Sequence, residues 1–240
     1  MKKLLAQIAW VLGLTFLLLA VPRFGGFIAN QFDYRAIDPD GAFAWISVHH
    51  IVQAMVFLVL MVAIGRARGV DFGFGWGDRA VGFRFVLIFS LFFAGYIVVS
   101  MGIVLAFGTF SLFPYPLTLR NVAGQLGFQL LLSGPSEELI FRAFAITMLA
   151  FATRRTIANG RLSVATIIAA VIFGLAHVGI SLSPFALTGD PFQVVYATGL
   201  GIAYGICYER SKSVYYPMMM HSISNVIAVG VSAVATAMIG

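Results

Sequence analysis

Charged residues and cysteine are both scarce in this chain. Only 10% of the 240 residues are charged, whereas an average soluble domain has about 25%. The single cysteine, Cys207, excludes an internal disulfide framework and a cysteine-rich zinc site. What is abundant is apolar: 60% of the residues are hydrophobic, and 23 of them are phenylalanine. This composition indicates a polytopic membrane protein, and a soluble domain does not fit it.

The formal net charge of +6 does not indicate a nucleic-acid partner. The basic residues lie at the ends of apolar runs, which is where they set the orientation of membrane helices. One set of alternate connections holds eleven of them: Lys2, Lys3, Arg66, Arg68, Arg79, Arg84, Arg154, Arg155, Arg161, Arg210 and Lys212. The other set holds three: Arg23, Arg35 and Arg120. The bias predicts a cytoplasmic N-terminus and a C-terminus on the outer side.

The apolar runs predict an all-α, polytopic membrane protein of about seven transmembrane helices, because about 20 apolar residues cross a bilayer. The expected spans are 4–22, 45–65, 84–107, 121–152, 162–180, 191–208 and 214–238. We divide the chain into N-terminal helices (1–119) and a core (120–238). The first run has no clear signal-cleavage site, so we expect it to be retained. Gly134-Pro135 predicts a break or kink in the fourth span.

Three charged residues lie inside that fourth span: Glu137, Glu138 and Arg142. Each costs about 2.5–3.5 kcal/mol at the centre of a spanning helix, or roughly 7–10 kcal/mol together before any pairing. Glu138 and Arg142 are four residues apart and can pair on one helix face. Glu137 points about 100° away from Glu138 and is free to face something else. An intramembrane cluster of this kind indicates a functional site.

Two further spans carry polar residues that can complete the cluster. His177 ends the fifth span, and His221 and Asn225 share one face of the seventh. A glutamate with a histidine can deprotonate a water, and Asn225, Arg142 or His221 can donate to the resulting oxyanion. No serine or cysteine has the context of a nucleophile, so water is the expected one. Alternatively, Glu137, His177 and His221 can act as ligands of a catalytic zinc ion.

These motifs, Glu137-Glu138-x-x-x-Arg142, Phe173-x-x-x-His177 and His221-x-x-x-Asn225, resemble those of the CPBP family. This family includes the CAAX prenyl endopeptidases of the Rce1 type and many bacterial intramembrane proteases, also termed Abi-type. The resemblance covers roughly residues 120–230. It implies a glutamate-dependent endopeptidase, often classed as a metalloprotease. Glu137 and His177 would then activate the water, His221 and Asn225 would stabilise the oxyanion, and Glu138 and Arg142 would organise the site.

The expected partners are the lipid bilayer and a membrane-associated protein or peptide substrate, and the expected location is a bacterial plasma membrane. Two other functions use the same residues. A non-catalytic scaffold or bacteriocin-immunity protein would bind a membrane partner, and an ion-coupled transporter would use the acids and histidines as a proton relay. Repeated halves, which many transporters have, are not detectable here. We expect His49 and His50, at the start of the second span, to be interfacial residues rather than ligands.

Overall fold

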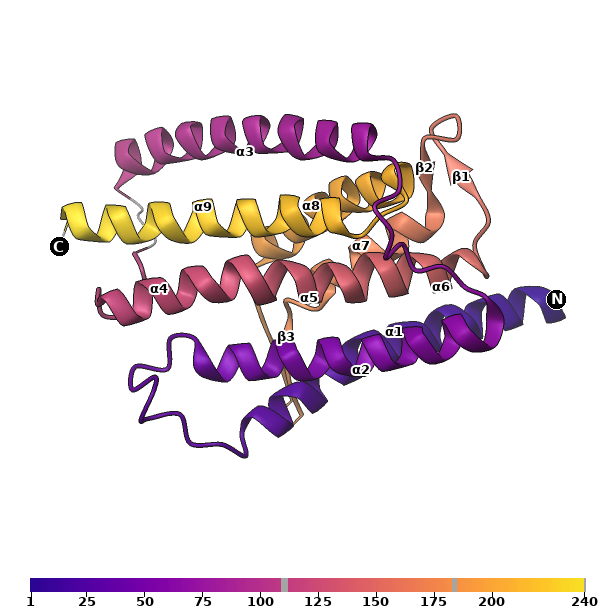
Figure 1. Cartoon of the computed structure of the whole chain (residues 1–240), viewed down its shortest axis with the longest axis horizontal. Helices are drawn as coiled ribbons and strands as arrows, with labels where there is room; N and C mark the ends of the chain where they lie inside the picture. Colours follow the sequence, from indigo (N-terminus) through magenta and orange to yellow (C-terminus); the bar gives the residue numbers. More distant parts are fainter. Residues whose placement is uncertain (109–111, 183–184, 240) are drawn as a thin grey trace.

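The computed structural model describes residues 1–108, 112–182 and 185–239, whose helices run largely along one axis (Figure 1). The first three helices are α1 (Lys2–Ala29), α2 (Ala44–Arg68) and α3 (Arg79–Phe107). A continuous helical stretch follows, made of α4 (Leu119–Phe128), η1 (Gln129–Ser133), α5 (Gly134–Glu138), η2 (Leu139–Ile146) and α6 (Thr147–Ala150), where η1 and η2 are π-helical. The last three helices are α7 (Val164–Leu175), α8 (Pro191–Ser211) and α9 (Tyr215–Ile239).

Two short antiparallel hairpins interrupt the otherwise helical chain. Strand β1 (Thr156–Ile157) pairs with β2 (Leu162–Ser163), and β3 (Gly179–Leu182) pairs with β4 (Phe185–Thr188). The mainly α-helical class is therefore confirmed, but the sequence analysis did not predict either hairpin. The second hairpin occupies a connection directly after His177, between α7 and α8.

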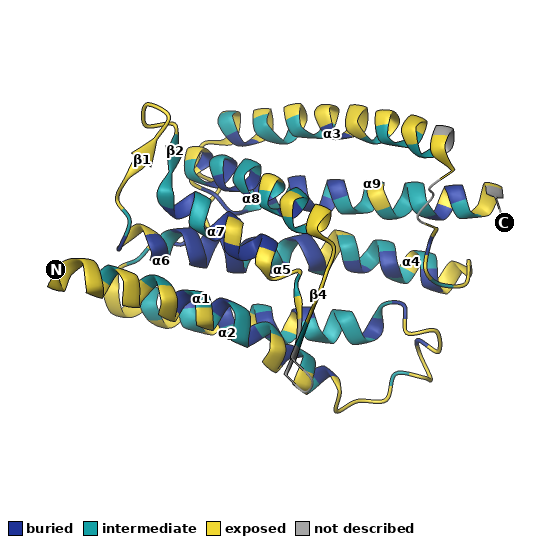
Figure 2. Ribbon diagram, turned by 180° about the vertical axis from the view of Figure 1, so that it is seen from behind, coloured by how far each residue is buried: buried dark blue, intermediate teal, exposed yellow. Residues whose placement is uncertain are grey.

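Four helical segments are long and apolar enough to cross a membrane within the described residues. They are Lys2–Ala29, Ala44–Arg68, Arg79–Val104 and Tyr215–Met238. Helix α7 is apolar but has only 12 residues, so a total of seven spans stays a prediction. The outer face of α3 is exposed along its length (Figure 2) and carries large apolar side chains such as Leu91, Phe92 and Val98. An apolar face of this extent fits contact with lipid.

The connections of the bundle gather at its two ends. The start of α1, the α2–α3 connection and the β1–β2 hairpin lie at one end, on the right in Figure 1. The α1–α2 loop, the start of α4 and the C-terminus lie at the opposite end. The segments with most of the basic residues therefore share one end of the molecule, as the charge count predicts.

Side chains at the helix starts explain several of the observed boundaries. Asp78, Thr118, Ser163 and Asp190 each accept a hydrogen bond from a backbone N–H in the first turn of α3, α4, α7 and α8, respectively. Such caps satisfy donors that have no partner within the helix. At the other ends, Gly69 and Gly108 adopt φ angles of 65° and 67°, which only glycine reaches without strain.

The predicted break at Gly134-Pro135 takes the form of a changed helical winding. Proline has no N–H to donate, so an ordinary α-helical bond to the carbonyl four residues earlier is missing. The chain passes this point by widening into the π-helical turn η1 just before it, and it widens again in η2. Short π-helical segments of this kind are common at functional sites. Here they flank Glu137 and Glu138 on both sides.

Helix α9 lies unusually close to this stretch at Gly134. A Cβ atom at Gly134 would lie 2.7 Å from Ser222 Oγ and 2.8 Å from Ser222 N, both on α9. Helix α2 packs on the same stretch from another side, where the rings of Phe57 and Phe144 lie 4.9 Å apart and both residues are buried. The acidic segment is therefore held between α2 and α9.

Candidate active site

The buried carboxylate of Glu138 is the centre of a charged network. Its Oε2 lies 2.8 Å from Arg142 Nε, and its Oε1 lies 2.7 Å from His221 Nδ1. Glu138 and Arg142 are both fully buried, and His221 is nearly so. The predicted pairing of Glu138 with Arg142 is confirmed. The network also ties the α5–η2 stretch to α9, because both imidazole and guanidinium face the same carboxylate.

Two aromatic rings enclose the Arg142 guanidinium. Its Cζ atom lies 4.6 Å from the centre of the Phe173 ring and 5.3 Å from that of Tyr204. The terminal nitrogens of Arg142 have no hydrogen-bond partner among the described residues. The two ring faces therefore supply the favourable contact that a buried cation needs. Phe173, which the sequence analysis named only as part of a motif, holds Arg142 in place.

Glu137 has a different environment from its neighbour. Its side chain is 19% exposed, and no ion-pair contact shorter than 3.8 Å is found for it within the described chain. Oε2 lies 3.8 Å from His221 Nε2, and Oε1 lies 3.9 Å from His50 Nε2. Both distances exceed a hydrogen bond. The Glu137 carboxylate is therefore available to a small molecule, whereas that of Glu138 is occupied.

A cavity of about 210 Å³ brings the predicted side chains together. A buried water needs roughly 10–15 Å³ by a comparable measure, so this space holds a water with part of a larger molecule. Of the residues that line it, six are polar and relevant to chemistry: Gln129, Ser133, Glu137, His177, His221 and Asn225. The predicted convergence of the fourth, fifth and seventh spans is thus observed.

His177 lies at the mouth of this cavity, just after α7 ends, and the residue is exposed. Its Nδ1 lies 2.9 Å from the carbonyl oxygen of Phe173, and its ring meets that of Phe173 edge-on at 5.0 Å. In the described part of the chain, no ion pair or hydrogen bond joins His177 to Glu137. A water or substrate group between them is needed for the two residues to act together.

Asn225 lines the cavity, but its side-chain amide is hydrogen-bonded to other residues of the protein. Its Nδ2 donates to Gln129 Oε1 at 2.8 Å and to Ser133 Oγ at 3.1 Å. Both partners precede Glu137 on the same helical stretch, and the sequence analysis missed them. Their signal was weak, because one glutamine and one serine in an apolar run suggest helix contacts as readily as a site. Asn225 can donate a hydrogen bond to an oxyanion only if it gives up its hydrogen bond to Gln129 or to Ser133.

A family model described as "Rce1-like: Type II CAAX prenyl endopeptidase Rce1-like" matches residues 119–227, just under half of the chain. These residues, the Rce1-like segment, are similar to the Rce1-like family. The resemblance drawn from the three motifs is thereby confirmed. No curated protein and no solved structure matches the chain. Together with the long apolar helices, this similarity to a membrane-protease family indicates an integral, multi-pass membrane protein.

The Rce1-like segment contains every residue that the motifs singled out, but the site extends beyond it. His50, on α2, is only 6% exposed and faces Glu137 from outside the segment. The expectation that His50 is interfacial was wrong, because Phe128 of α4 and Ser136 and Glu137 of α5 cover this side chain. His49 and His50 are adjacent near the start of α2, and only packing distinguishes them. The His49 ring contacts Trp45, with ring centres 5.3 Å apart.

The donor atoms of the Rce1-like segment do not converge as zinc ligands. Among the described residues, no group of three or more His, Cys, Asp or Glu side chains is arranged to hold a metal ion. His221 Nδ1 is bonded to Glu138, His177 Nδ1 to a backbone carbonyl, and Glu137 lies 3.8 Å from His221 Nε2. The zinc ligand set Glu137, His177 and His221 therefore does not fit this geometry.

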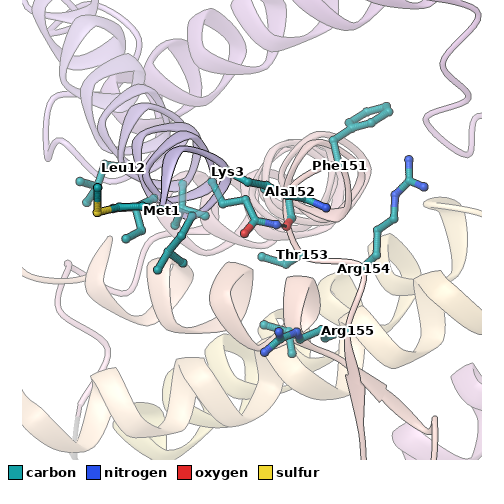
Figure 3. A pocket seen from close by; sticks show the side chains of 13 residues that line it. Met1, Lys3, Leu12, Phe151, Ala152, Thr153, Arg154 and Arg155 are labelled. Atoms are coloured by element: carbon teal, nitrogen blue, oxygen red, sulfur yellow. Dashed lines mark hydrogen bonds between the residues drawn. The ribbon is translucent and has the colours of Figure 1, made fainter.

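A larger groove lies elsewhere, along the start of α1 (Figure 3). It measures about 1050 Å³ and is lined mainly by apolar residues together with Lys3, Arg154 and Arg155. No carboxylate or imidazole is among its lining residues. Volume alone would favour this groove, but the groups needed for hydrolysis surround the smaller cavity of the Rce1-like segment.

Proposed function

We propose that this protein is an intramembrane endopeptidase that hydrolyses a peptide bond in a membrane-associated protein or peptide. The observation that carries the proposal is the shared cavity, which is lined by Glu137, His177, His221 and Asn225. Similarity to the Rce1-like family supports the same reaction class. The substrate need not be prenylated. We further propose seven spans, a cytoplasmic N-terminus and a location in a bacterial plasma membrane.

Glu137 is the proposed general base, because its carboxylate is ionisable, faces the cavity and is free of a close ion pair. It takes a proton from a water held between it and His177. The water oxygen bonds to the carbonyl carbon of the substrate, and the carbonyl oxygen becomes an oxyanion. The carbon–nitrogen bond then breaks, and Glu137 returns the proton to the leaving amine. The products are a new carboxylic acid and a new amine, which become a carboxylate and an ammonium group when the acid proton passes to the amine.

His221 is the proposed oxyanion donor. In its doubly protonated form, Nδ1–H donates to Glu138 and Nε2–H points to the cavity, where it stabilises the negative oxygen. Gln129 assists from the other wall: its Oε1 accepts from Asn225, which leaves its amide N–H groups for the substrate. The Glu138–Arg142 pair acts indirectly by holding His221 in this orientation.

Comparison of membrane peptides from three cell strains tests the proposal. The strains express the wild type, Glu137→Gln, or the control Asp33→Asn, which changes an exposed residue in the α1–α2 loop. We expect peptides that are cut in the wild-type and Asp33→Asn strains and intact in the Glu137→Gln strain. If folded Glu137→Gln protein gives the wild-type peptide pattern and cellular phenotype, the chain acts as a scaffold or immunity protein, not as a peptidase.

A further inference from the structure

His50 is a buried histidine that contacts the ring of its neighbour His49, with ring centres 5.3 Å apart, and the helical stretch that carries the proposed base. Its Nδ1 lies 2.7 Å from Ser136 Oγ, and its Nε2 lies 3.9 Å from Glu137 Oε1. The rings of His50 and Phe128 pack edge to face, with their centres 4.9 Å apart. His50 is not among the residues that line the cavity, whereas His221, which lies 3.8 Å from the other Glu137 oxygen, is.

The hydroxyl of Ser136 decides which His50 nitrogen carries the proton. This hydroxyl has one hydrogen and two neighbouring acceptors: His50 Nδ1 at 2.7 Å and the Ser133 carbonyl oxygen at 3.3 Å. Donation to the nearer imidazole nitrogen leaves the ring proton on Nε2, directed at Glu137 Oε1. Donation to Ser133 would instead turn a nitrogen lone pair toward an ionised carboxylate, which is repulsive. The first arrangement is the one compatible with Glu137 acting as a base.

Packing alone does not account for this side chain. A buried imidazole loses its hydration, and an apolar ring would fill the space beside Phe128 without that cost. The adjacent His49 provides a contrast on the same helix, because its ring packs on Trp45 and its Nδ1 has no hydrogen-bond partner among the described residues. His49 interacts with Glu137 only through longer-range electrostatics, whereas His50 lies within 4 Å of a Glu137 oxygen and 2.7 Å from Ser136 Oγ.

We propose that His50 is a positioning residue for Glu137. The Ser136 hydroxyl donates to His50 Nδ1, which leaves the ring proton on Nε2, where it faces Glu137. Across 3.9 Å, its N–H attracts one Glu137 oxygen electrostatically without a hydrogen bond, so that the other oxygen faces the cavity. Its effect on turnover rests on the proposed peptidase function, whereas the contact itself does not. The catalytic site would then be built from the Rce1-like segment and one helix outside it.

Two substitutions separate positioning from structural support. The terminal amide of glutamine reaches the place of Nε2, whereas the shorter asparagine reaches only that of Nδ1. His50→Gln therefore keeps a donor for Glu137, and His50→Asn keeps only the contact with Ser136. His49→Gln is the matched control on the neighbouring residue. The probe is an internally quenched peptide with an S-farnesyl cysteine fourth from its C-terminus, tested on the full chain in nanodiscs.

We expect kcat to fall roughly 10–100-fold in His50→Asn with little change in KM, and to fall much less in His50→Gln. His49→Gln should match the wild type. If His50→Asn retains turnover and His50→Gln loses it, His50 supports Ser136 only and the proposal is overturned. Wild-type turnover in all variants also overturns it.

A second readout does not depend on activity. Carbodiimides modify the protonated form of a buried carboxyl group, and mass spectrometry measures the rate at Glu137. Loss of the N–H that stabilises the ionised form should speed labelling several-fold in His50→Asn but not in His50→Gln. Equal rates in all variants refute the contact. If the wild type leaves the probe uncut while the labelling rates differ as expected, the positioning stands and the peptidase function fails for that probe.

Discussion

Glutamine in place of Glu138 should destabilise the protein strongly, whereas the same change at Glu137 should not. Glu138→Gln removes the negative partner of Arg142, which is fully buried and has no other acid within ion-pair distance in the described chain. It also leaves His221 Nδ1 with a neutral partner. Glu137→Gln removes a carboxylate whose nearest ionisable groups are at 3.8 and 3.9 Å.

The magnitude follows from the burial of the pair. Breaking a buried ion pair by removing one partner costs about 3–5 kcal/mol, because the other charge stays buried without compensation. In a chain of this length each kcal/mol lowers Tm by roughly 2–4 °C, so Glu138→Gln should lower it by about 6–20 °C. The cation–π contacts of Arg142 offset part of this loss, which favours the lower half of the range. Glu137→Gln should change stability by less than about 1 kcal/mol.

Thermal unfolding of the purified variants in the same detergent measures both values side by side. The double variant Glu138→Met/Arg142→Met completes the test, since removal of both charges should cost less than the sum of the single changes. Equal Tm values for Glu137→Gln and Glu138→Gln would refute the reasoning. Additive costs in the double variant would show that the 2.8 Å ion pair is not the source of the stability.

Four other predictions concern helix packing, loop structure, a surface ion pair and metal dependence. Gly134→Ala should lower the free energy of unfolding by about 1–3 kcal/mol, because the added Cβ would lie 2.7 Å from Ser222 Oγ. Gly127→Ala is the control: its Cβ would have nothing within 4 Å, so this change should be neutral or slightly stabilising. Thermal unfolding of the two variants distinguishes these outcomes. Asp38 accepts hydrogen bonds from three backbone N–H groups at the start of α2, so Asp38→Ala should cost about 2 kcal/mol. Asp33→Asn should have no measurable effect on Tm, because the Asp33–Arg35 pair is exposed to solvent. Arg35 holds the pKa of Asp33 below its usual value, so the small contribution of the pair is present near neutral pH and is lost as the pH falls. Peptidase activity should stay within about twofold of its untreated value after treatment with 1,10-phenanthroline, because the described His, Cys, Asp and Glu side chains do not converge as zinc ligands. A loss of activity that added zinc restores would contradict this geometry.

The sequence predicts the helices well, because apolar runs and basic flanks report directly on length and burial. It also predicts the Glu138–Arg142 pair, since a spacing of four residues fixes one helix face. The convergence of His177 and His221 with Glu137 needed the family motif, because spacing along the chain does not reveal how separate helices pack. The resemblance itself is confirmed by the match of the Rce1-like family model to residues 119–227.

The sequence could not predict the role of α2 in the site. His49 and His50 are adjacent and chemically identical, so the choice between them depends on the rotation of α2 against the π-helical stretch. The π-helical turns themselves follow from Pro135 only in part, because a proline in a helix can equally produce a kink. The two hairpins could not be predicted for a different reason. Their strands are only two to four residues long, which is too short to show an alternating pattern of apolar and polar residues.

The central claim, that Glu137 activates a water in the shared cavity, is tested most directly with purified protein and a substrate peptide taken from the strain comparison. Cleavage by the wild type in H₂¹⁸O should place ¹⁸O in the new carboxylate, and Glu137→Gln of equal Tm should be slower by roughly 10²–10⁴-fold. A Glu137→Gln variant that cleaves the same bond at the wild-type rate would contradict the account.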